Sequence, residues 1–216
     1  MKYIREAGNG FTHLFGAILS FVGLLALVIK TSIYDPDPLS ITSVIIFGMS
    51  MIFLYTASTV YHMVISTDKV IAWLRKLDHS MIFILIAGSY APFCFISLNT
   101  PSAWILFSVI ALVAIAGVCF KLIWFRCPRW LSTLMYVAMG WLSVVLIVPL
   151  YKVLSASGLS LLVAGGIFYT IGAIIYAVKP SFLNFKYFGF HEIFHVFIIL
   201  GSLCHFLCVY MYVIVK

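Results

Sequence analysis

Long apolar segments separated by short polar connectors make up almost the whole chain. Each segment holds about 20 residues, the length that an α-helix needs to cross a hydrocarbon layer roughly 30 Å thick. The pattern predicts seven membrane-spanning helices at about residues 11–29, 41–64, 79–98, 103–124, 131–150, 159–178 and 192–215. The predicted fold is therefore all-α, a polytopic seven-transmembrane-helix bundle that forms one membrane domain over residues 1–216, without a soluble domain.

The connectors hold the residues that end helices. Proline-containing turns at 35–38, 99–101, 127–128 and 179–180 and a polar stretch at 66–76 separate the apolar segments. The first segment follows two basic residues, which raises the alternative of a cleaved signal peptide. It is long for such a peptide and ends at Lys30 without a cleavage motif, so we expect it to remain as the first spanning helix.

Composition agrees with a membrane protein. Hydrophobic residues make up 64% of the chain and charged residues 9%, whereas about 25% of the residues in ordinary soluble domains are charged. The formal charge of +7 comes from Lys and Arg in the short connectors. We interpret these residues as signals of membrane topology and not as a binding patch, so no nucleic-acid partner is expected.

The basic residues also predict an orientation. The N-terminus and the second, fourth and sixth connectors hold 10 of them, and the other side holds 3. By the positive-inside rule, the N-terminus is cytoplasmic and the C-terminus is outside. The 10 residues are Lys2, Arg5, Lys69, Arg75, Lys76, Lys121, Arg126, Arg129, Lys179 and Lys186, and the 3 are Lys30, Lys152 and Lys216.

Five of the six histidines fall at the predicted cytoplasmic ends of the helices. Asp78, at the start of the third segment, shares their depth. Ionisable residues at membrane depth are costly, so such residues are candidates for a functional site. These histidines are His13, His62, His79, His191 and His195.

Helical spacing then selects candidate metal ligands. His191 and His195 are four residues apart, so both imidazoles project from one helix face and can hold one ion. His62 is the candidate third ligand. Three histidines leave a tetrahedral Zn²⁺ one open position for water, the pattern of a catalytic site. Asp78 would contact that water or act as general base.

Structural explanations stay open for the same residues. Asp78 would also suit the N-cap of the third helix, and Ser58 would also bond to a carbonyl of its own helix. Glu6 and Asn9 would also suit a solvated N-terminal segment. His205 lies about ten residues deeper than His195, and we expect it to bridge helices instead of binding metal.

Residues 191–195 also spell HExxH, the zinc-protease signature in which the Glu activates water. Intramembrane metalloproteases need a further ligand, commonly an Asp on a later helix. No acidic residue follows Glu192, and Gly201 stands where the extended motif requires a third His. Peptidase activity is therefore disfavoured.

Four stretches together resemble the hemolysin III family, the bacterial branch of the progestin and adiponectin receptor superfamily, over essentially the full length. They are Glu6-x-x-Asn9-x-x-x-His13, Ser58-x-x-x-His62 in STVYHM, Asp78 in KLDHSMIFILIAGSYAPF, and FGFHEIFHVFIILGS with His191 and His195.

The resemblance implies a seven-helix bundle in the bacterial plasma membrane. It also implies zinc bound by His62, His191 and His195, with Asp78 contacting the zinc-bound water. Glu6, Asn9, His13 and Ser58 belong to the motifs, and a role in orienting the metal ligands would suit them. The superfamily is similar to alkaline ceramidases, which hydrolyse a lipid amide.

Three functions follow from these observations. The leading hypothesis is a zinc-dependent hydrolase, such as an amidohydrolase, that acts on a lipid amide or ester; whether there is turnover is left open. The second is a cytolysin, although seven apolar spans leave no water-soluble form for release. The third is a regulator of membrane state in which zinc only fixes the helices. Membrane lipid is the expected partner in each case.

Overall fold

A computed structural model describes residues 3–124, 126–185 and 188–214 of the chain. Within these ranges the structure is helical and contains no strand. Seven helical segments in the same ranges are long and apolar enough to cross a membrane, which confirms the predicted all-α, seven-span fold. Three residues of the charge count, Lys2, Lys186 and Lys216, lie outside the described residues.

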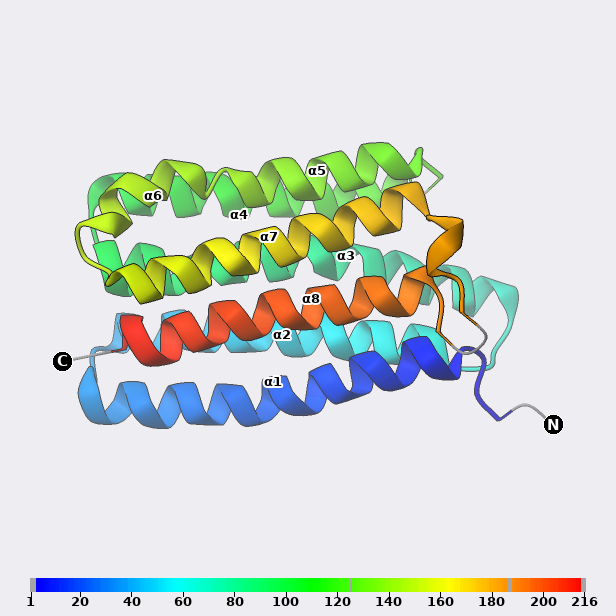
Figure 1. Cartoon of the computed structure of the whole chain (residues 1–216), viewed down its shortest axis with the longest axis horizontal. Helices are drawn as coiled ribbons and strands as arrows, with labels where there is room; N and C mark the ends of the chain where they lie inside the picture. The colour runs from blue at the N-terminus through cyan, green and yellow to red at the C-terminus, as the bar shows by residue number, and fades with distance from the viewer. Residues whose placement is uncertain (1–2, 125, 186–187, 215–216) are drawn as a thin grey trace.

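Successive spans run in opposite directions, with the fifth span broken in two, and α8 returns to α1 to close the bundle (Figure 1). One end of the bundle therefore gathers the start of α1, the end of α2 and the start of α8. The elements are α1 (Ala7–Tyr34), α2 (Pro38–Met63), α3 (Asp68–Pro92), the π-helical η1 (Phe93–Leu98), α4 (Pro101–Ile123), α5 (Arg129–Trp141), α6 (Val144–Tyr151), α7 (Ala156–Val178), the 3-10 turn η2 (Ser181–Leu183), α8 (Phe190–Cys208) and the π-helical η3 (Val209–Val213).

Side-chain caps start several helices where the sequence has a break. The Asp37 carboxylate accepts hydrogen bonds from the backbone N–H groups of Leu39 and Ser40, at 3.0 and 3.2 Å, and Pro38 takes the first helical position of α2. Thr100 caps α4 in the same way, with Pro101 in the first position. These caps satisfy N–H groups that would otherwise have no partner in the helix.

The third span begins earlier than predicted, at Asp68 instead of residue 79. Val70, Ile71 and Leu74 are apolar at helical spacing, and Leu74 is buried, so a stretch that looks polar in the sequence forms the first turns of a helix. Asp78 consequently lies well inside α3, and its interpretation as the N-cap of the span is wrong.

The fifth predicted span is two helices, α5 and α6, separated by a break at Leu142 and Ser143. The Tyr90 hydroxyl of α3 lies 2.8 Å from the carbonyl oxygen of Met139 and 2.9 Å from that of Gly140. The Gly140 carbonyl also accepts from the backbone N–H of Ser143, so the hydroxyl matters most to the Met139 carbonyl, which lies next to the break in apolar surroundings.

Candidate metal centre

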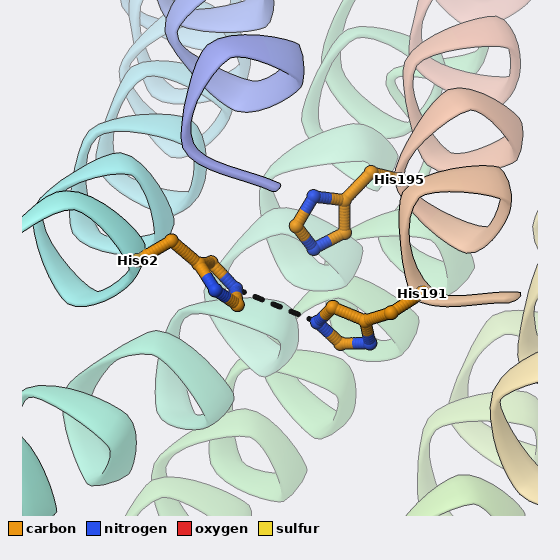
Figure 2. Close-up of side chains that lie close together, drawn as sticks. All are labelled: His62, His191 and His195. Carbon is orange, nitrogen blue, oxygen red and sulfur yellow. Dashed lines mark hydrogen bonds between the residues drawn. The ribbon is translucent and has the colours of Figure 1, made fainter. Parts of the chain in front are cut away.

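Three histidine side chains converge at the end of the bundle where α1 begins. His62 comes from the last turn of α2, and His191 and His195 come from the first turns of α8; their rings point toward one another (Figure 2). One ring nitrogen from each lies within 4.8 Å of the other two, so the three residues can hold a metal ion. His62 and His195 are each 1% exposed. The i,i+4 spacing of His191 and His195 therefore brings them together as predicted.

The Glu6 carboxylate fixes the orientation of His62. Nδ1 of His62 lies 2.6 Å from Oε2 of Glu6, and because an ionised carboxylate only accepts, Nδ1 is the donor. Burial raises the pKa of Glu6. The hydrogen bond from His62, the charge of His62 and the charge of Arg5 together lower the pKa by more, so the pKa of Glu6 lies below its usual value. Nε2 of His62 is left with a lone pair, 3.4 Å from Nε2 of His191.

His195 is oriented by the backbone of α1. Its Nδ1 lies 3.3 Å from the carbonyl oxygen of Asn9 and 3.1 Å from the Thr12 hydroxyl, which itself donates to the same carbonyl. A carbonyl only accepts, so Nδ1 is protonated and Nε2 carries the lone pair. His13 stacks on His195, with ring centroids 3.5 Å apart. Two of the three candidate ligands thus present an unprotonated Nε2.

An apolar cavity of about 210 Å³ adjoins this group and runs into the bundle. His13, His191 and His195 line one part of it, together with Asp78 and Ser58. Asp78 is 8% exposed, and the Ser58 hydroxyl lies close to its carboxyl group. The remaining walls are mainly aliphatic and aromatic side chains of α3, α5, α6, α7 and α8. Asp78 therefore lines the same cavity as two of the three candidate ligands, His191 and His195.

Comparison with known proteins adds relatives to this geometry. A model of the family described as haemolysin-III related matches residues 1–206. The chain belongs to this family. It is 41% identical over 210 residues to Hemolysin-3 of Bacillus cereus, covering 97% of this chain and 92% of that protein. It is 38% identical over 208 residues to the Hemolysin-3 homolog of Bacillus subtilis, covering 96% and 94%.

The haemolysin-III-related match includes all four motifs on which the resemblance was based. A more distant relative is the human protein named monocyte to macrophage differentiation factor, 25% identical over 215 residues, with 96% of this chain and 84% of that protein covered. Together with the seven apolar spanning helices, the Bacillus relatives indicate a multi-pass protein of the bacterial cell membrane.

Glu192 has a structural task in this haemolysin-III-related chain. Its Oε2 accepts a hydrogen bond of 2.9 Å from the backbone N–H of Gly189, which caps the start of α8. The carboxylate thus faces the residues before α8, whereas a zinc protease aims this Glu at the water on its metal. The HExxH interpretation remains disfavoured.

His205 bridges helices, as expected for its depth. Its Nε2 lies 3.2 Å from the carbonyl oxygen of Leu162, which ties α8 to α7 away from the three histidines. Thr12 and Arg5 also contact the candidate site, although sequence analysis singled out neither as part of it. Arg5 donates to the carbonyl oxygen of Tyr61 and lies over its ring, next to Glu6. The one sequence feature that points to this contact is the position of Arg5 directly before Glu6.

Proposed function

We propose that this protein is a zinc-dependent hydrolase that cleaves an amide or ester bond of a membrane lipid at the cytoplasmic face. The observation that carries the proposal is a group of three converging histidines, two of which, His191 and His195, line an apolar cavity that also contains a buried carboxyl group. A metal site for electron transfer or structure alone would not require such a chamber.

The ligand set favours zinc. Three imidazoles suit Zn²⁺, whose bonds to nitrogen are about 2.0–2.1 Å long, and tetrahedral geometry then separates the nitrogens by roughly 3.4 Å. The Nε2 atoms of His62 and His191 are 3.4 Å apart. Glu6 and the Asn9 carbonyl bind the Nδ1 atoms of His62 and His195, so the Nε2 lone pairs of these two rings stay available to a metal. Bound zinc would polarise the substrate carbonyl and lower the pKa of a water molecule.

The chain's own groups would supply the remaining steps. Asp78 would accept a proton from the attacking water and return it to the leaving amine or alcohol, with the Ser58 hydroxyl beside its carboxyl group. Glu6 and the Asn9 carbonyl would keep the two imidazoles in the tautomer that leaves Nε2 free. The apolar cavity walls would hold the acyl chain and keep bulk water away.

The cytoplasmic placement is part of the same proposal. The site lies at the end of the bundle that holds Arg5, Arg75, Lys76 and Arg129, and this excess of basic residues favours the cytoplasmic side.

The hydrolase proposal is tested by turnover. Purified protein in detergent would be loaded with zinc and incubated with a bacterial lipid extract, and mass spectrometry would follow the release of free fatty acids. We expect release by the wild type and a loss of at least about 100-fold in Asp78→Asn, the contribution typical of a general base. Asp78→Asn should keep its zinc, which separates a lost proton acceptor from a lost metal. Equal release by both proteins would contradict the role of Asp78, and absence of release from every lipid class would overturn the hydrolase.

A further inference from the structure

A second cavity, of about 340 Å³, lies at the same end of the bundle, and its charged side chains are all cationic. Arg75 reaches it from α3, Lys121 from α4, Arg126 from the α4–α5 connection, and Arg129 from α5. None of the described residues that line it is acidic. Arg75 also interacts electrostatically with Asp78, but Asp78 lines the apolar cavity.

Membrane topology alone does not account for this arrangement. The positive-inside rule requires basic residues on one side of the membrane but not their convergence on a single cavity. Lys121 is 2% exposed, and its ammonium group donates to the Ser132 hydroxyl and lies 3.4 Å from Cys127 Sγ. A lysine whose only task was to mark the cytoplasmic side would remain in water, where its charge is solvated at no cost.

The basic cavity adjoins the candidate metal centre. His79, Ile82, Tyr136 and Tyr176 line both cavities, so the two share a wall. The Arg129 guanidinium lies 5.1 Å from the centre of the Tyr176 ring, and the centre of the His191 ring lies 5.9 Å from the same centre. Tyr176 therefore neighbours both a cation of the basic cavity and a candidate metal ligand.

We propose that this basic cavity binds the phosphate group of a lipid whose scissile carbonyl faces the three histidines and whose chain fills the apolar cavity. The proposal rests on the proposed function and names its substrate class, a phosphate-bearing lipid. Arginine guanidinium groups bind phosphate oxygens through paired N–H donors, and basic pockets between helices at the cytoplasmic side suit anionic headgroups. Three arginines and one lysine would neutralise such a group.

Binding of two lipids that differ only in the phosphate tests the assignment. The probes are an ether-linked dialkyl phosphatidic acid, which a hydrolase of esters or amides cannot cleave, and the matched dialkylglycerol. We expect the wild-type protein in detergent to bind the phosphatidic acid at least about tenfold more tightly, as one charge-assisted hydrogen bond would give. Arg129→Gln and Arg126→Gln should each lose most of this preference while dialkylglycerol binding stays the same.

Lys152→Gln is the matched control, because it removes an exposed positive charge from the connector between α6 and α7 at the other end of the bundle. It should bind both lipids as the wild type does. An equal loss of preference in Lys152→Gln and Arg129→Gln, or no preference in the wild type, would overturn the proposal. Inorganic phosphate that competes as strongly as the phosphatidic acid would assign the cavity to a free anion and would also overturn the lipid assignment.

Metal content of the same samples separates this proposal from the hydrolase. Arg129→Gln and Arg126→Gln should bind as much zinc as the wild type, which also shows that they are folded. A wild type that binds no metal, but prefers the phosphatidic acid through Arg129, would refute the hydrolase and support the basic cavity. A wild type that binds zinc and releases fatty acids, but shows no preference for phosphate, would support the hydrolase and refute the assignment of the basic cavity.

Discussion

At the residue scale, the contact between Glu6 and His62 decides which imidazole nitrogen is available for metal. The carboxylate holds the proton on Nδ1 and leaves the Nε2 lone pair directed at the other two rings. Replacement of such an orienting partner typically lowers metal affinity about 10- to 100-fold. We therefore expect Glu6→Gln to lower zinc affinity by this factor in titrations with a competing chelator.

Asp37→Asn serves as the control for Glu6→Gln, because Asp37 caps α2 at the far end from the site. Asn accepts the same backbone hydrogen bonds, so this variant should keep its fold and leave zinc affinity unchanged. Zinc affinity in Glu6→Gln equal to that of the wild type would show that the His62 tautomer does not depend on Glu6.

The sequence predicts these site residues unevenly. Helix geometry predicts that His191 and His195, four residues apart, share one helix face. Their shared depth with His62 and Asp78 predicts that these two residues lie at the same end of the bundle. The role of Asn9 is different, because its backbone carbonyl and not its side chain contacts His195. A backbone contact leaves no trace in residue type, so it was not predictable from one sequence. The Thr12 hydroxyl contact was missed because a threonine in the first turns of a helix is ordinary in sequence.

At the element scale, the Tyr90 hydroxyl is the side-chain group that contacts the carbonyl groups next to the break between α5 and α6. Tyr90→Phe would remove that donor from the carbonyl oxygen of Met139 in apolar surroundings, whereas the Gly140 carbonyl would keep the backbone N–H of Ser143. Loss of one partner of a buried hydrogen bond costs about 1–3 kcal/mol. We expect a lower unfolding temperature for Tyr90→Phe, measured in detergent by the fluorescence of the tryptophans.

Tyr151→Phe provides the comparison, because Tyr151 is exposed at the end of α6. A Tyr90→Phe protein as stable as Tyr151→Phe would show that the break does not need the hydrogen bond of Tyr90.

The sequence predicted one uninterrupted span here because Leu142 and its neighbours are apolar, and hydropathy does not report local helix geometry. The start of α3 was mispredicted for a related reason: its first turns have one apolar face and one polar face.

At the scale of the whole molecule, orientation in the membrane is the main prediction. Seven spans place the two termini on opposite sides, and the excess of basic residues assigns the N-terminus to the cytoplasm. Fusion of alkaline phosphatase, which is active only outside the cytoplasm, to the C-terminus should give an active enzyme in intact cells. A fusion after Ile123, at the end of α4, should be inactive. The opposite pair of activities would reverse the topology and place the histidines outside.

Zinc binding by the three histidines is the claim on which the account depends. Metal content would be measured by elemental analysis after zinc loading and removal of free metal, in wild type, His62→Ala, His191→Ala, His195→Ala and His205→Ala. We predict about one zinc per chain in the wild type and in His205→Ala, and a loss of most of it in the other three, because two imidazoles bind zinc far more weakly than three. Well-folded wild type without zinc, or full zinc content in His195→Ala, would contradict the account.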